Sequence, residues 1–237
     1  MNFTRAFAYI FEDRDWLAKL IVTFTVTAGA ILLTPVVIGV ALWAALLGYL
    51  VELVRNVRAD IPQPLPHWDH FSAKMRRGFP VLGALVVYGI PNAVLVGCLL
   101  TLAPSLSTNI TGTGVTLGIA CCVFPLLLVY NLVALPVLAL GIARYADDPR
   151  FGVFLQVGSL FSLLQEHTDA LIQYVFSTLL ASLALGLFAL IPCIGWVALP
   201  ALVVPVHGAL MGQFAGRVLG KPKVKNKREP PMQPYRR

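Results

Sequence analysis

The sequence predicts an all-α integral membrane protein with six transmembrane helices arranged as three hairpins. The first observation behind this fold class is composition. The chain is 58% hydrophobic and only 12% charged, whereas a typical soluble domain carries about 25% charged residues. The second is segregation, because the 18 basic and 11 acidic residues lie between the long apolar runs or at their ends. A run of about 20 apolar residues is long enough to cross the hydrocarbon core of a bilayer.

Six runs meet this length requirement. Pro35 and Gly39 favour a turn between the first two runs, and a tight turn at 191–195 separates the last two. Prolines inside the runs do not argue against spans, because neighbouring helices can satisfy the carbonyl groups they free. The predicted membrane domain covers residues 1–220. Its spans are expected at about 17–34, 36–54, 80–103, 115–143, 170–190 and 196–215.

The basic residues predict the orientation of these spans. Every Lys and Arg falls in one of four segments that an alternating six-span topology places on the same side of the membrane: 1–19, 55–77, 144–150 and 217–237. The positive-inside rule puts that side in the cytoplasm. Both termini are therefore expected to be cytoplasmic, in agreement with an even number of spans.

An aromatic-rich cytoplasmic segment precedes each predicted hairpin, at 3–11, 65–71 and 151–164. Such segments suit helices that lie in the headgroup plane with their apolar face toward the lipid. The alternative is ordinary loops with aromatic anchors. Three prolines at 62, 64 and 66 disfavour a helix at the start of the second segment.

One block of the chain is distinctive. The end of the second run reads GYLVELVR at 48–55, LPHWD follows at 65–69, and Gly78 precedes the next run. This block resembles a family of prokaryotic multi-pass membrane proteins catalogued as a domain of unknown function, number four-zero-one-three, over most of residues 5–215. The resemblance implies a helical membrane domain of an uncharacterised family, integral to the cytoplasmic (inner) membrane of a bacterium or archaeon, and no known activity.

Polar groups inside the spans are candidates for a ligand or transport site. His207 lies near the middle of the sixth run, and Asn92 and Asn131 lie in the third and fourth. His207 could relay protons or bind a haem or pigment metal, or could simply bond to a neighbouring helix. The two asparagines could join helices or line a polar substrate site.

The densest polar cluster is His67, Trp68, Asp69 and His70. His67 and His70 could share a helical face, but two ligands are too few for a closed metal site. We expect no metal here and interpret the cluster as an interfacial anchor built on Trp68.

Glycines recur at four-residue intervals along the last run, as Gly208, Gly212, Gly216 and Gly220. Such a stripe allows another helix to approach closely. Ser182 and Gly186 on the fifth run are a plausible counterpart, and a second subunit is the alternative.

The tail at 221–237 is basic and rich in proline. Near an anionic leaflet each Lys or Arg contributes about 1 kcal/mol, so the tail is expected to bind anionic lipid or a partner. A single aromatic residue, Tyr235, and the lack of a folded module argue against nucleic-acid binding. The residues expected to dock are Lys221, Lys223, Lys225, Lys227 and Arg228.

The sequence contains no HExxH, GxSxG or Walker-type motif, and no catalytic residues are predicted. The leading hypothesis is a non-enzymatic structural or accessory subunit of a larger membrane assembly, with other membrane subunits as partners. The absence of charges inside the spans, the glycine stripe and the basic tail motivate it. The alternative is a transporter of a small solute or lipid. A weaker alternative is a subunit that binds a pigment or haem through His207, and the identity of any cofactor is left open.

Overall fold

The computed structural model describes residues 3–106, 110–191 and 194–222 of the chain. In this part of the chain, every regular element is a helix and there are no strands. The predicted all-helical class is therefore confirmed. The helices are α1 (Phe3–Phe11), α2 (Trp16–Leu32), α3 (Val37–Arg58), α4 (Phe71–Leu106), α5 (Ile110–Asp147), α6 (Gly152–Leu155), α7 (Val157–Glu166), α8 (Thr168–Ala189) and α9 (Ile194–Leu219).

Five of these helices are long and apolar enough to cross a membrane, which confirms a multi-pass pattern of apolar helices. They are α3, α4 up to Thr101, α5 from Gly118, α8, and α9 from Leu199. The predicted first span corresponds to α2, an apolar helix of 17 residues that is shorter than the other five.

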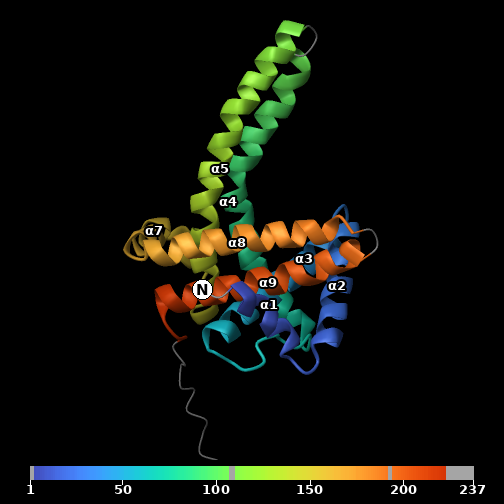
Figure 1. Cartoon of the computed structure of the whole chain (residues 1–237), viewed down its shortest axis with the longest axis vertical. Helices are drawn as coiled ribbons and strands as arrows, with labels where there is room; N and C mark the ends of the chain where they lie inside the picture. Colours follow the sequence, from blue (N-terminus) through green and yellow to red (C-terminus); the bar gives the residue numbers. More distant parts are fainter. Residues whose placement is uncertain (1–2, 107–109, 192–193, 223–237) are drawn as a thin grey trace, which may run out of the picture.

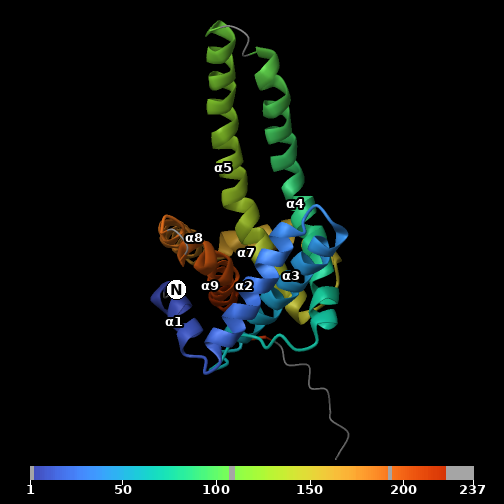
Figure 2. The same cartoon turned by 90° about the vertical axis from the view of Figure 1, so that its right-hand side faces the viewer.

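The molecule has two parts, a body and a protruding hairpin. The outer halves of α4 and α5 extend together away from the other helices (Figures 1 and 2). These helices have 36 and 38 residues, and each is more than about 50 Å long at a rise of 1.5 Å per residue. In Figure 1, α8 and α9 lie side by side across the base of this hairpin.

At the centre of the body, α3 packs against α2, α4, α5 and α9. The tightest approach is between α3 and the first turns of α4. A Cβ added to Gly48 would lie 1.9 Å from the carbonyl oxygen of Lys74, and one added to Gly78 would lie 1.7 Å from that of Ala44. Because the two backbones touch, only glycine fits at either position.

The segments expected at the membrane surface differ from one another. The first is helix α1, and the third forms the two short helices α6 and α7, which are separated at Gln156. Residues 61–70 contain no helix, because Pro62, Pro64 and Pro66 remove backbone donors and restrict the residues before them. Helix α4 then begins at Phe71, nine residues before the expected third span. Hydropathy locates an apolar segment, whereas the helix continues into polar sequence.

Candidate functional site

A polar hollow lies where the loop 61–70 passes over α2, the end of α3 and the start of α4. Its volume is about 450 Å³. The predicted cluster residues His67, Asp69 and His70 line it, and all three are exposed. The other polar residues in its lining are Lys19, Glu52, Asn56, Gln63, Lys74 and Arg77.

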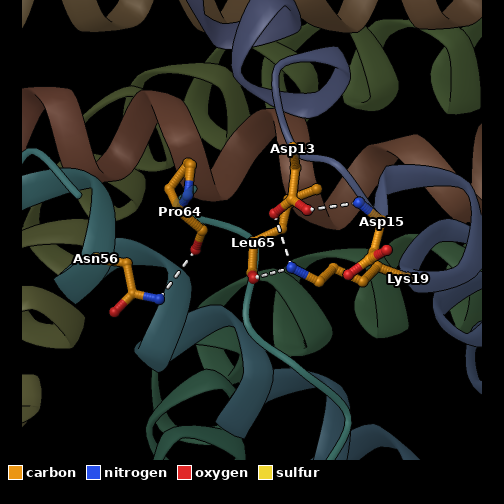
Figure 3. Close-up of polar contacts among 6 residues, drawn as sticks. All are labelled: Asp13, Asp15, Lys19, Asn56, Pro64 and Leu65. Carbon is orange, nitrogen blue, oxygen red and sulfur yellow. Dashed lines mark hydrogen bonds and ion pairs between the residues drawn. The ribbon is translucent and has the colours of Figure 1, made fainter. Parts of the chain in front are cut away.

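Side chains from two helices hold the loop in place (Figure 3). The amide of Asn56 on α3 donates to the carbonyl oxygen of Pro64 at 2.9 Å, and the ammonium of Lys19 on α2 donates to that of Leu65 at 3.0 Å. The proline-rich loop cannot satisfy these carbonyl groups with its own N–H groups. Lys19 and Asn56 therefore replace the missing secondary-structure bonds.

Lys19 is also half of a buried ion pair. Its ammonium lies 2.7 Å from Oδ2 of Asp13, and the two side chains are only 6% and 1% exposed. Oδ1 of Asp13 accepts a further bond from the backbone N–H of Asp15 at 3.0 Å (Figure 3). A buried charge is tolerated when it is paired and hydrogen-bonded. This pair joins the break between α1 and α2 to the loop.

Trp68 has a different position from its neighbours in the sequence. Its indole stacks on Tyr49 with 4.8 Å between ring centroids and donates to Oγ1 of Thr23 at 3.1 Å. The ammonium of Lys74, which is paired with Glu52, lies 5.8 Å from the centre of the Tyr49 ring. The indole thus packs against buried residues, and its role as an interfacial anchor stays a prediction. Tyr49 offers an apolar face and Thr23 a hydroxyl, so the indole packs inward.

Charged side chains of both signs line the hollow. Three cationic residues, Lys19, Lys74 and Arg77, face two carboxylates in its lining, which holds no Ser, Thr or Cys side chain. Within the described ranges, no group of three or more His, Cys, Asp or Glu side chains is arranged to hold a metal ion.

His207, predicted as a ligand or relay residue, links α9 to α8. Its Nδ1 lies 2.9 Å from the carbonyl oxygen of Val203, and its Nε2 lies 3.2 Å from Oγ of Ser182. A carbonyl group only accepts, so we assign the ring proton to Nδ1, and Nε2 then accepts from the serine hydroxyl. Both ring nitrogens are engaged in these two bonds.

Asn92 and Asn131 face each other across the α4–α5 hairpin. Each amide nitrogen donates to the other's Oδ1 at 3.0 Å, and Nδ2 of Asn131 also donates to the carbonyl oxygen of Leu127 at 2.7 Å. The pair joins two helices that are otherwise apolar at this level. Neither residue lines a described pocket.

The four glycines of the predicted stripe, three in α9 and Gly220 just after it, have unequal surroundings. A Cβ on Gly208 would lie 2.6 Å from Cδ2 of Leu53, and one on Gly212 would lie 2.6 Å from Cβ of Val57. A Cβ on Gly216 would meet only Cγ of Arg58, at 3.9 Å, and Gly220 follows the helix with a φ of +70°. These two close contacts are with α3. The sequence instead predicted that the stripe packs against Ser182 and Gly186 on α8. Ser182 contacts α9 through His207, outside the stripe, and nothing lies within 4 Å of a Cβ on Gly186.

A buried arginine that the sequence does not single out marks the start of the tail. Nε of Arg58 donates to the carbonyl oxygen of Gly220 at 2.6 Å, and its guanidinium lies 2.8 Å from Oδ2 of Asp147. Lys221 is exposed, with its ammonium 3.4 Å from Oδ2 of Asp60. The other predicted docking residues, Lys223, Lys225, Lys227 and Arg228, lie outside the described residues.

Sequence reasoning singled out His67–His70 as a polar cluster and interpreted it as an interfacial anchor, but it missed Lys19, Asp13 and Arg58. Lys19 and Asp13 lie six residues apart across a helix break, and Arg58 and Asp147 lie 89 residues apart. Neither separation is a helical spacing that a reader could recognise. Both cations also look like ordinary positive-inside residues at the ends of spans.

The residues that make the sequence distinctive meet at this junction: Gly48 and Gly78 at the α3–α4 contact, Tyr49 stacked on Trp68, and Leu65 bonded to Lys19. The model of a family described as "Protein of unknown function (DUF4013)" matches residues 28–195. No match is found among curated proteins, and none among solved structures.

Proposed function

We propose that this chain, which belongs to the DUF4013 family of proteins of unknown function, is a non-enzymatic structural or accessory subunit of a larger membrane assembly. The observation that carries the proposal is the exposed apolar surface of the outer α4–α5 hairpin. Large apolar side chains stand outward along both of its helices, and no other part of the described chain covers them. They include Val86, Val94, Leu100, Phe124, Leu128 and Val129, each between 53% and 68% exposed.

The surroundings of the polar span residues support a subunit rather than a transporter. A polar pathway would present Asn92, Asn131 and His207 to a cavity. The two asparagines instead bond to each other, and His207 bonds to Val203 and Ser182. A pigment or haem on His207 would have to displace the Ser182 hydroxyl from Nε2.

A photo-crosslinking amino acid placed at Leu128 or Phe124 in intact membranes tests the proposal. We expect one discrete protein adduct at these exposed hairpin positions. The matched control is Leu53 in the body, which is 1% exposed and should give only crosslinks within the chain. Adducts with lipid alone at both hairpin positions would contradict a partner there.

For the topology, we propose six spans in the cytoplasmic membrane of a prokaryote, with both termini cytoplasmic and α1 and α6–α7 lying at the membrane surface. The complete segregation of basic residues supports it. At 17 residues, α2 is near the lower limit for a span, and a short span is tolerated through local thinning of the bilayer at modest cost. The basic tail at 221–237 is proposed to bind anionic lipid.

Reporter fusions test this topology. Fusions after residues 60, 148 and 225 should report the cytoplasm, and one at 109 should report the far side. A fusion at 192 adds a sharper test, because α8 and α9 lie across the base of the hairpin in Figure 1. A far-side signal at 192 means that α8–α9 crosses the membrane, whereas a cytoplasmic signal there or at 109 contradicts the six-span topology.

A further inference from the structure

An apolar groove lies in the corner where the α4–α5 hairpin leaves the body above α6 and α7. Its walls come from Tyr88, Val129, Tyr130 and Val137 of the hairpin, and Leu155 and Phe161 lie at its base. Its volume is about 460 Å³, which falls within the range of about 300–1,000 Å³ typical of ligand sites.

The polar atoms nearest the groove are already bonded within the protein. The hydroxyl of Tyr130 donates to the carbonyl oxygen of Tyr88 at 2.7 Å, and the hydroxyl of Tyr88 donates to that of Phe154 at 3.0 Å. The two tyrosines therefore present rings rather than donors to the groove. An occupant would meet aliphatic and aromatic carbon, as an acyl chain does in a bilayer.

A cation stands at the polar end of the same face. Tyr130, Val137 and Arg144 are spaced seven residues apart on α5, so they share one side of the helix. Arg144 lies about 10 Å beyond Val137 at 1.5 Å per residue. Its NH1 donates to Oγ of Ser159 on α7 at 3.2 Å, and no carboxylate of the described residues forms an ion pair with it.

Two other arginines near this end of α5 are neutralised. Arg58 pairs with Asp147, and the exposed Arg150 pairs with Asp148. The hydrogen bond from Arg150 to Asp148 raises the pKa of this guanidinium further above its ordinary value. Arg144 is thus the arginine of the α5–α7 region whose charge is left for an external anion.

We propose that this groove binds one acyl chain of an anionic phospholipid, with the phosphate held by Arg144. Apolar contact alone cannot select a lipid, because lipid tails are as apolar as the side chains that face them. Selectivity must then come from the phosphate and the net charge of the headgroup, which a guanidinium binds through charge-assisted hydrogen bonds. This inference requires insertion in a membrane but does not depend on the subunit role proposed above.

The test is lipid titration of the purified full-length protein in mild detergent, followed by native mass spectrometry. The probes are phosphatidylglycerol and phosphatidylcholine with identical acyl chains. We expect phosphatidylglycerol to be retained where phosphatidylcholine is lost, with one of its bound molecules depending on Arg144. Arg144→Gln should weaken phosphatidylglycerol binding by about tenfold or more, as expected for a hydrogen-bonded charge. Arg150→Gln, in the same connection, should leave it unchanged.

A second pair of variants tests the groove itself. Val129 and Leu128 are adjacent and 60% and 53% exposed, but only Val129 lines the groove. Val129→Trp should fill it and release the lipid, whereas Leu128→Trp should not. Equal retention of the two lipids, full binding by Arg144→Gln, or equal effects of the two Trp variants would overturn the proposal. A dimer that Val129→Trp dissociates would assign the groove to a second copy of the chain instead.

Discussion

The body and the outer hairpin are both built from long apolar helices, yet their apolar side chains are buried in the body and exposed in the hairpin. In the body, Tyr49, Val54, Leu210 and Phe214 are fully buried. In the outer hairpin, side chains of the same kind, such as Phe124, are mostly exposed. The comparison teaches that hydropathy marks where a helix can meet lipid, but not whether lipid or protein covers it.

Glycines separate the two regions in the same way. Gly48, Gly78, Gly208 and Gly212 each stand where an added Cβ would come within 3 Å of another helix. In the hairpin, nothing lies within 4 Å of a Cβ at Gly89, Gly97 or Gly118. The body therefore depends on backbone contact, whereas the hairpin is joined by side chains such as the Asn92–Asn131 pair.

The largest effect is expected at the α3–α4 contact. Gly78→Leu should destabilise the isolated protein by at least about 4 kcal/mol or prevent folding, because the new side chain collides with backbone that cannot yield. Gly97→Leu in the hairpin is the control and should melt near the wild type in mild detergent. Similar melting temperatures for the two variants would remove the distinction between body and hairpin.

The next effect is expected at the buried ion pair. Lys19→Met leaves the Asp13 carboxylate buried without its cation. The free energy of unfolding, measured by heat or denaturant, should fall by about 3–5 kcal/mol. Replacing both partners, as Lys19→Met with Asp13→Leu, should recover most of that loss. Lys221→Met is the exposed control, since Lys221 and Asp60 are 76% and 59% exposed, and such pairs contribute about 0–1 kcal/mol. If the two lysine variants lose equal stability, the Lys19 pair is not buried.

A smaller loss of stability is expected for substitutions in the glycine stripe of α9, and it should decrease from Gly212 to Gly216. Gly212→Leu should cost about 1–3 kcal/mol by overpacking against Val57, and Gly216→Leu should cost less because its nearest neighbour is 3.9 Å away. Both helices belong to one chain, so the loss should appear in the thermal stability of the isolated protein. Loss of a partner without any change in melting temperature would show that the stripe contacts another subunit.

The smallest effect is expected inside the hairpin. Asn92→Leu should destabilise by about 0.6–2 kcal/mol, the range for polar contacts between membrane helices. The double variant with Asn131→Leu should be closer to the wild type, because no donor is then left without a partner. The coupling energy from the double-mutant cycle measures the pair directly, and a value near zero would show that the two amides do not interact.

The helices were largely predictable, and the prolines at 62, 64 and 66 correctly disfavoured a helix in the second segment. The helix ends were less predictable, as α4 shows by starting at Phe71. At the candidate site, His67, Asp69 and His70 do share one polar hollow. The inward stacking of Trp68 was missed, because it requires Tyr49 and Thr23 to lie beside a loop that is distant in sequence.

By itself, the sequence determined that the chain forms long apolar helices and roughly where along the chain each of them lies, because length and hydropathy are properties of consecutive residues. Only the tertiary structure decided which glycines touch α3 and which apolar faces stay exposed. It also decided that Lys19 pairs with Asp13 and bonds to Leu65. Each of these depends on residues from separate segments meeting within a few ångströms. Packing energies fall off over that distance, and the spacing of residues along the chain does not show which segments come that close.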